Sequence, residues 1–248
     1  MADAQGPPSP PRSFPLASLI EELDQTMLKY LPNALTLLRL VLAPVVAWAV
    51  WQAYALPADA AANSPQNFDA ELSGAQSWAL LAAGLFIFAA LTDLFDGMAA
   101  RALGVDSKFG RLIDPIADKA LVGLPLIAIS VVAWKAQWPL WWAIAASTAV
   151  IVLRDLVISV LRFTSSDGEG ARVSQLAKWK TAIELIAVGV PILFAAAPAL
   201  VKLLGLGEGF AISDVMTLGW IGLLALAALL SAVTALQYLA AKPAQPQS

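Results

Sequence analysis

The sequence predicts an all-α, polytopic membrane protein with six transmembrane helices and an N-terminal juxtamembrane amphipathic helix. Hydrophobic residues make up 59% of the chain and charged residues only 13%, and the mean hydropathy is +0.73. Soluble domains carry about 25% charged residues. A spanning helix needs about 20 residues, and apolar runs of that length occupy nearly all of the 248 residues.

Composition changes divide the chain into four parts. Residues 1–15 are rich in Pro, Ala and Ser and are expected to be a disordered tail. Residues 16–31 place apolar side chains on one helix face opposite acidic ones, which is typical of a helix on the membrane surface or packed against the protein. Residues 32–241 form the six-helix transmembrane domain, and residues 242–248 form a second disordered tail.

The six spans follow from the apolar runs and the breaks between them. They are expected at about 31–55, 78–100, 109–134 and 139–161, then after the segment 173–181 as far as about 204, and finally at 215–240. The breaks at 57–76, 104–108 and 163–175 are expected to be polar loops or turns.

Basic residues gather on one side of the predicted topology. They are Lys29, Arg101, Lys108, Arg111, Arg162, Arg172, Lys178, Lys180 and Lys242, whereas the other side has only Lys135 and Lys202. The positive-inside rule therefore predicts that both termini are cytoplasmic. For Arg162 and Arg172, setting this orientation is also a sufficient role.

The chain has no cysteine and no histidine. This excludes disulfides, thiol nucleophiles, zinc clusters and histidine general bases. The acid–base chemistry of an enzyme with this sequence would fall to carboxylates, Lys, Arg, Tyr or water. The net charge of −3 is too small to indicate a partner.

Four aspartates stand where the second and third spans meet the predicted cytoplasmic side. They are Asp93, Asp96, Asp114 and Asp118. The first two lie at i, i+3 and the last two at i, i+4, so each pair shares a helix face. Carboxylates this close repel each other and are costly to bury in a membrane. A hard divalent cation removes that cost, and oxygen-only ligands indicate Mg²⁺, Mn²⁺ or Ca²⁺ rather than zinc.

Two neighbours extend this cluster toward a ligand. Gly97 leaves an open position on the carboxylate face, and Arg101, one turn on, is suited to grip a phosphate or to pair with an aspartate. The alternative is structural. Single aspartates often mark only the end of a span, and Asp114 before Pro115 fits a plain helix N-cap. The set as a whole, at this spacing, favours a site.

The pattern D-x2-D-G-x2-A-R-x8-G-x3-D-x3-D resembles the signature of the CDP-alcohol phosphatidyltransferases. Its fixed positions are all present: Asp93, Asp96, Gly97, Ala100, Arg101, Gly110, Asp114 and Asp118. The start of the first span and the segments 154–162 and 178–181 resemble the phosphatidylglycerophosphate synthases, a bacterial branch of that family. The resemblance covers roughly residues 30–240.

The resemblance implies transfer of a phosphatidyl group from CDP-diacylglycerol to glycerol 3-phosphate, with CMP as the leaving group. It implies two metal ions, Mg²⁺ or Mn²⁺, held by the four aspartates, and Asp118 as general base. It also implies a CDP site, with candidates Asn33, Thr36, Asp93, Gly97, Arg101 and Gly110. A homodimer in the bacterial inner membrane, facing the cytoplasm, is the further expectation.

Charged residues inside the spans indicate where the acceptor binds. A phosphate site needs Arg or Lys, and the candidates are Arg154, Arg162, Lys178 and Lys180. Arg154 lies inside a span beside Asp155, so a ligand or partner is expected. Glu184, one turn after Lys180, is placed to pair with it. Arg39 in the first span is expected either to be paired or to snorkel toward the headgroups.

Other functions stay open at this point. Within the family the acceptor could instead be phosphatidylglycerol, as in cardiolipin synthesis, or serine or an inositol phosphate; the basic residues argue against serine. An ion or proton transporter also uses membrane carboxylates, but such sites usually lie near the midplane on broken helices. A non-catalytic scaffold is the remaining alternative.

Overall fold

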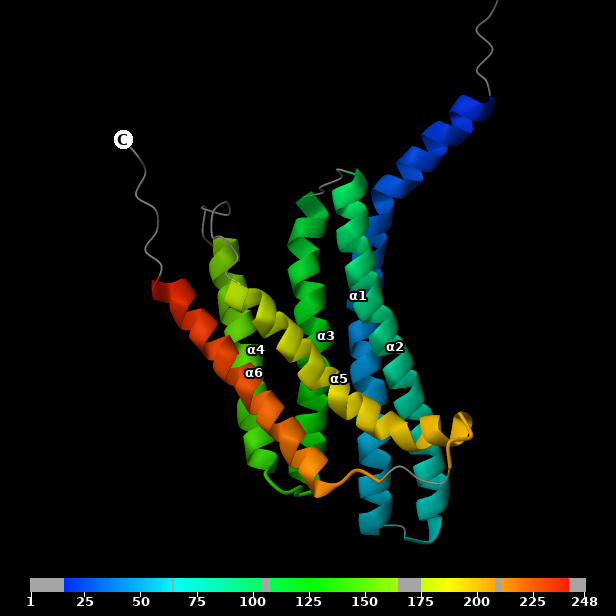
Figure 1. The fold of residues 1–248 in the computed structure, drawn as a ribbon, viewed down its shortest axis with the longest axis vertical. Helices are drawn as coiled ribbons and strands as arrows, with labels where there is room; N and C mark the ends of the chain where they lie inside the picture. Colours follow the sequence, from blue (N-terminus) through cyan, green and yellow to red (C-terminus); the bar gives the residue numbers. More distant parts are fainter. Residues whose placement is uncertain (1–15, 64, 104–107, 165–174, 208–210, 241–248) are drawn as a thin grey trace, which may run out of the picture.

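The computed structural model describes residues 16–63, 65–103, 108–164, 175–207 and 211–240. Within these ranges the chain is helical apart from short turns and contains no strand (Figure 1). The elements are α1 (Leu16–Asn63), a 3₁₀ turn (Pro65–Asn67), α2 (Phe68–Leu103), α3 (Lys108–Lys135), α4 (Trp141–Thr164), α5 (Gln175–Leu203) and α6 (Asp214–Ala240).

The predicted fold class is confirmed. In the described part of the chain, six helical segments are long and apolar enough to cross a membrane: Asn33–Asn63, Phe68–Asp93, Ile113–Lys135, Trp141–Leu161, Trp179–Leu203 and Asp214–Ala240. The predicted tails, 1–15 and 242–248, lie outside the described residues, as do most of the predicted loops at 104–108 and 163–175.

Two predictions about helix ends need correction or refinement. The segment 57–76 was expected to be a polar loop, and this is wrong, because α1 continues to Asn63 and α2 begins at Phe68. The segment is rich in Ala, which favours helix even outside the bilayer. The segment 16–31 is helical as expected, but it runs without a break into the first span, as the N-terminal part of α1 (Figure 1).

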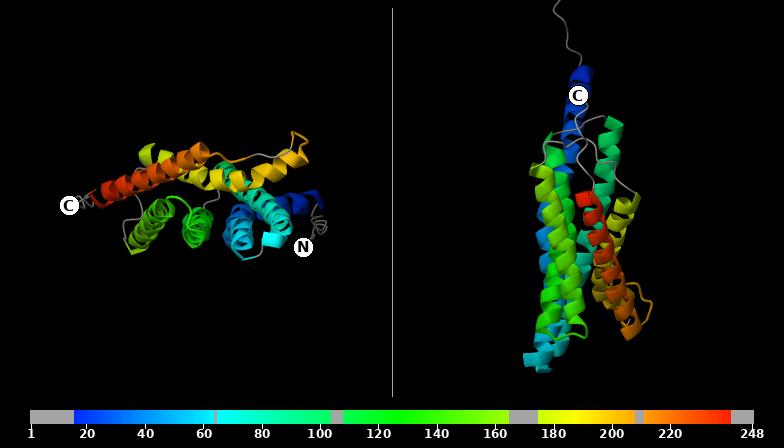
Figure 2. Two further views of the ribbon diagram at one scale, coloured as in Figure 1. Left: turned by 90° about the horizontal axis from the view of Figure 1, so that it is seen from below. Right: turned by 90° about the vertical axis from the view of Figure 1, so that its left-hand side faces the viewer.

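The helices form two groups. α1 packs along both α2 and α3, and α4 packs against α3 and α6. Figure 2 shows α5 and α6 together on one side of α1, α3 and α4, where α5 contacts α2 and α6. The close packing of α1 on its neighbours depends on small side chains such as Ala43, Ala49 and Ala82, each buried to 1% exposure or less. Small residues let membrane helices approach closely.

Two helix ends are closed by the backbone itself. At the end of α3, Trp138 N donates to Ala133 O at 2.9 Å, and Gln137 adopts a left-handed conformation with φ +50°. At the end of α5, Leu206 N donates to Val201 O at 3.0 Å, and Gly205 has φ +66°. Both are Schellman-type ends, which satisfy the last carbonyls of the helix.

Candidate functional site

The helices alternate in direction, so one end of the bundle brings together the predicted site segments. The first span begins there at Asn33, the second ends there at Asp93, and the third begins there at Ile113. The last turns of α4 and α6 and the first turns of α5 lie at the same end (Figure 1). The predicted aspartates and basic residues therefore share one end of the bundle.

Arg39 of α1 joins two of the aspartates. Its Nη1 donates to Oδ1 of Asp93 on α2 at 2.5 Å and to Oδ1 of Asp118 on α3. Arg39 is fully buried, at 0% exposure, whereas the side chains of Asp93 and Asp118 are 54% and 47% exposed. An arginine inside a span is costly unless paired, and these contacts pair it. Arg39 therefore does not snorkel to the headgroups, and the two carboxylates stay open to a ligand.

Thr36 holds a third aspartate. It lies one turn before Arg39 on the same face of α1, is 3% exposed, and donates its hydroxyl to Oδ1 of Asp114. Asp114 lies inside α3, which begins at Lys108. The alternative that Asp114 is only a helix N-cap is therefore wrong. One face of α1 thus fixes three carboxylates from two other helices.

The donor set fits a hard divalent cation. Asp93, Asp114 and Asp118 offer only carboxylate oxygens, the ligand type that Mg²⁺ and Mn²⁺ prefer. Among the residues whose side chains are described, no three acidic groups are gathered closely enough to form a complete metal site. The fourth predicted ligand, Asp96, lies outside that part. In this arrangement the guanidinium of Arg39 supplies the positive charge between Asp93 and Asp118.

Several predicted site residues have side chains outside the described part of the structure. They are Asp96, Gly97, Arg101, Gly110, Arg162 and Lys178. Asn33 is half-buried at the start of the first span. The metal, nucleotide and acceptor roles expected for these residues stay predictions.

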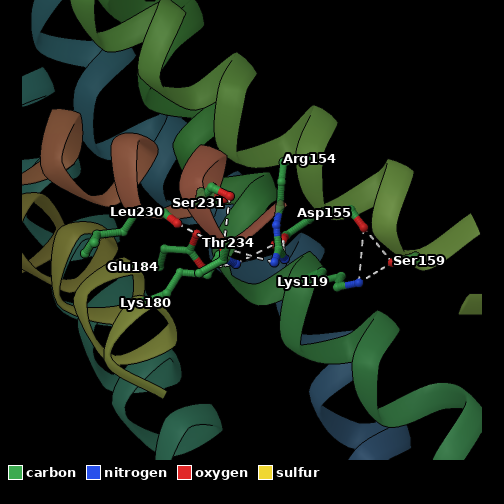
Figure 3. A network of polar contacts seen from close by, with 9 residues as sticks. All are labelled: Lys119, Arg154, Asp155, Ser159, Lys180, Glu184, Leu230, Ser231 and Thr234. Atoms are coloured by element: carbon green, nitrogen blue, oxygen red, sulfur yellow. Dashed lines mark hydrogen bonds and ion pairs between the residues drawn. The ribbon is translucent and has the colours of Figure 1, made fainter. Parts of the chain in front are cut away.

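Four buried charged side chains form a second cluster, between α4, α5 and α6 (Figure 3). Oδ1 of Asp155 accepts from Nη1 of Arg154 at 2.8 Å and from Nζ of Lys180 at 3.0 Å. Nζ of Lys180 also lies 2.8 Å from Oε2 of Glu184, which confirms the predicted pair. The four side chains are at most 15% exposed. Two cations and two anions therefore balance inside the membrane-spanning region.

Lys119 connects the two clusters. It directly follows Asp118 on α3, and its Nζ donates to the backbone carbonyl of Asp155 at 3.1 Å and to the hydroxyl of Ser159 (Figure 3). On the far side of the cluster, Nη2 of Arg154 donates to the Thr234 hydroxyl on α6 at 3.2 Å. The turn of α3 that carries Asp118 is thereby tied to the turn of α4 that carries Asp155.

Sequence reasoning did not include Arg39, Lys119 or Asp155 among the site residues. A signal for Arg39 and Asp155 was present, because a charged residue inside a span is expected to have a partner or ligand. The identity of that partner was not predictable, since it depends on how three separate helices pack. Lys119 carried the same signal, because it lies inside the third span, Ile113–Lys135.

Comparison with known proteins gives consistent matches. The family model described as CDP-alcohol phosphatidyltransferase matches residues 29–220. The CDP-diacylglycerol--glycerol-3-phosphate 3-phosphatidyltransferase of Cereibacter sphaeroides is 35% identical over 170 residues, which cover 64% of this chain and 62% of that protein. A probable phosphatidylglycerophosphate synthase of Mycobacterium tuberculosis is 35% identical over 163 residues, 66% of each chain. The matched region thus spans slightly less than two thirds of these relatives' length.

Proposed function

Since the family model matches most of it, this chain belongs to the CDP-alcohol phosphatidyltransferase family, and we propose that it makes phosphatidylglycerol phosphate from CDP-diacylglycerol and glycerol 3-phosphate. The observation that carries this proposal is the convergence of Asp93, Asp114 and Asp118 on one face of α1. The same end of the bundle holds the second cluster, in which Asp155 binds Arg154 and Lys180. The names of the relatives support glycerol 3-phosphate as the acceptor.

The aspartates would act on the pyrophosphate of the nucleotide lipid. Two divalent ions, Mg²⁺ or Mn²⁺, would neutralise phosphate charge when bound. Their ligands would be Asp93, Asp96, Asp114 and Asp118. The acceptor hydroxyl oxygen forms a bond to the phosphatidyl phosphorus while the bond from that phosphorus to CMP breaks, and CMP leaves with the electron pair.

Asp118 is the proposed general base that takes the proton of the acceptor hydroxyl. The chain has no histidine, so a carboxylate is the available base at this site. Arg39 donates to Oδ1 of Asp118, which leaves Oδ2 as the oxygen that would receive the proton. Arg39 would thereby fix the orientation of the carboxylate during the transfer.

The substrates would be held by residues on either side of the aspartates. For the CDP moiety we propose Asn33, Thr36, Asp93, Gly97, Arg101 and Gly110. For the phosphate of the acceptor we propose Arg154, Arg162, Lys178 and Lys180. The lipid tails would stay in the bilayer, since large apolar side chains such as Leu153 and Leu156 are about 60% exposed on the helix surface (61% and 58%).

We also propose a cytoplasmic position for the site, in the inner membrane of a bacterium, with both termini in the cytoplasm. The excess of Lys and Arg at the aspartate end supports it. A homodimer is proposed from the family resemblance alone, and chemical crosslinking of the protein in its native membrane would test it.

The test is CMP release by the purified full chain in detergent with CDP-diacylglycerol and Mg²⁺ or Mn²⁺. Glycerol 3-phosphate, inositol phosphate, serine and phosphatidylglycerol are supplied one at a time. We expect release with glycerol 3-phosphate only. Release with a different acceptor would reject the acceptor assignment and keep the aspartate chemistry. Absence of release with every acceptor, from folded protein, would reject the enzyme proposal and favour transport.

A further inference from the structure

The charges of Arg154 and Lys180 are already matched before any substrate binds. Asp155 accepts a hydrogen bond from each through one oxygen, at 2.8 and 3.0 Å, and Glu184 pairs with Lys180 at 2.8 Å. Buried cations without counter-charges are strongly unfavourable in a membrane. The two carboxylates therefore make it possible for two cations to stand side by side inside the spans.

The two cations nevertheless keep donors for a ligand. A lysine has three N–H donors and an arginine has five. Within the described part of the chain, Lys180 contacts Asp155 and Glu184, which occupies two of its three donors, and the buried Nε of Arg154 has no hydrogen-bond partner. The carboxylates thus fix the two cationic groups with some of their N–H bonds and leave others to bind an oxyanion.

The number of charges also fits the binding of a phosphate. Asp155 and Glu184 neutralise two of the four cations proposed for the acceptor, which are Arg154, Arg162, Lys178 and Lys180. The remaining two positive charges match a phosphate monoester, which carries a charge of about −1.5 to −2 at pH 7. Without the two carboxylates, the neighbouring charges of Arg154 and Lys180 would repel each other.

The cluster is also tied to the reacting end of the bundle. Lys119, next to Asp118, binds the backbone carbonyl of Asp155 at 3.1 Å, and Thr234 on α6 receives a hydrogen bond from Arg154 at 3.2 Å. The turn of α4 that carries Asp155 is therefore connected to the turn of α3 that carries Asp118 (Figure 3).

We propose that Asp155 and Glu184 are positioning residues for the acceptor: they hold Arg154 and Lys180 in place to receive the phosphate of glycerol 3-phosphate. This inference rests on the proposed function and assigns a role to two acidic residues inside a basic site. Asp155 has the larger part, because it contacts both cations, whereas Glu184 contacts only Lys180.

The experiment measures KM for each substrate in Asp155→Asn, Glu184→Gln and Asp155→Glu, with purified full-length protein. A charge-assisted hydrogen bond is typically worth enough to change binding by about tenfold or more. We expect Asp155→Asn to raise KM for glycerol 3-phosphate by roughly that factor, with KM for CDP-diacylglycerol little changed. Glu184→Gln should raise it less, and Asp155→Glu, which keeps the charge, should recover part of the loss.

The matched control is Ser130→Ala. Ser130 donates to Thr148 at 2.9 Å between α3 and α4 and is buried, at 8% exposure, so the variant loses a buried hydrogen bond outside the charged cluster. Its KM for both substrates should stay at the wild-type value. A lower KM for glycerol 3-phosphate in Asp155→Asn would make Asp155 a competitor of the phosphate, and would overturn the inference. Equal changes in the KM of both substrates would overturn it too.

Two further readouts separate this inference from the proposed function. Wild-type turnover with glycerol 3-phosphate tests the function alone. Thermal stabilisation of the detergent-solubilised protein by inorganic phosphate tests the cluster without turnover, and we expect Asp155→Asn to lose it. If Asp155→Asn does not fold, Glu184→Gln decides: an unchanged KM for glycerol 3-phosphate and unchanged phosphate stabilisation would reject the positioning role.

Discussion

Asp114 differs from the other two described aspartates in how it is held. It accepts a hydrogen bond from the neutral hydroxyl of Thr36, whereas Asp93 and Asp118 share the Arg39 guanidinium. An asparagine at position 114 can still accept the Thr36 hydrogen bond through its amide oxygen. Asp114→Asn therefore removes one negative charge from the site with little change in packing.

We expect Asp114→Asn to lower CMP release by about 100-fold or more, because charge stabilisation at the phosphoryl group is lost. The melting temperature should stay close to the wild-type value. Asp214→Asn is the matched control, since Asp214 is exposed in the first turn of α6. Activity retained in Asp114→Asn, at equal folding, would contradict the assigned role of the aspartates.

Arg39 is expected to stabilise the aspartate centre when no divalent ion is bound. Arg39→Met should leave Asp93 and Asp118 without their shared cation. Both carboxylates are about half exposed (54% and 47%), so solvent screening keeps the cost near 1–2 kcal/mol. That corresponds to a fall in melting temperature of roughly 2–8 °C for a chain of this size.

Divalent ions should partly replace the missing charge. We expect Mg²⁺ or Mn²⁺ to raise the melting temperature more in Arg39→Met than in the wild type, and Arg39→Lys to lie between the two. The measurement is thermal unfolding in detergent with and without the ion. An ion effect of the same size in all three proteins would show that Arg39 and the ion do not serve the same carboxylates.

At the scale of elements, Pro191 leaves one backbone carbonyl of α5 without its usual hydrogen-bond donor. Proline has no N–H, so the carbonyl four residues earlier, that of Ala187, loses its usual helical partner. Trp220 of α6 replaces that partner: its Nε1 donates to the Ala187 carbonyl at 2.9 Å. Both residues are buried, at 0% and 4% exposure. The proline thus helps to determine which face of α6 packs on α5.

Trp220→Phe should leave the Ala187 carbonyl unsatisfied, at a cost of about 1–3 kcal/mol. We expect the melting temperature to fall by roughly 2–4 °C per kcal/mol. Pro191→Ala, which restores an N–H at position 191, should recover much of this loss in the double variant. Strictly additive effects of the two changes would contradict the proposed link between the proline and the tryptophan.

The sequence predicts where the six spans lie, but not where the helices end. The six spans follow from hydropathy, because length and apolar content are local properties. The ends of the helices do not, since polarity marks where a chain leaves lipid rather than where a helix stops. This is why residues 57–76 were expected to form a loop, whereas α1 and α2 extend into them as far as Asn63 and from Phe68.

The aspartates of the site were predictable from the sequence, whereas the contacts of Arg39 and Asp155 were not. The spacing of Asp93, Asp114 and Asp118 is local to two successive helices, so the sequence indicates that these carboxylates face α1, where Arg39 contacts two of them and Thr36 contacts the third. The contacts of Arg39 and Asp155 join helices distant in sequence, and no local pattern specifies them. The sequence predicted that these charges need partners, and the packing of the helices determines which partners they find.

At the scale of the whole molecule, the membrane orientation decides whether the site can reach its substrates. The chain has no cysteine, so single cysteines can be introduced without background. Ala211 and Ala240 form a matched pair: both are exposed, and they lie just before α6 and at its last residue, hence at opposite ends of the bundle. Ala240 is at the end that holds the aspartates.

We expect a membrane-impermeant maleimide to label Ala211→Cys in intact spheroplasts and to label Ala240→Cys only after permeabilisation. The reason is that Lys and Arg are in excess at the Ala240 end, and basic loops remain in the cytoplasm. The reverse labelling pattern would place the aspartates and the Asp155 cluster on the outer face of the membrane. A water-soluble phosphorylated acceptor made in the cytoplasm would then have no access to the site, and the proposed reaction would have to be abandoned.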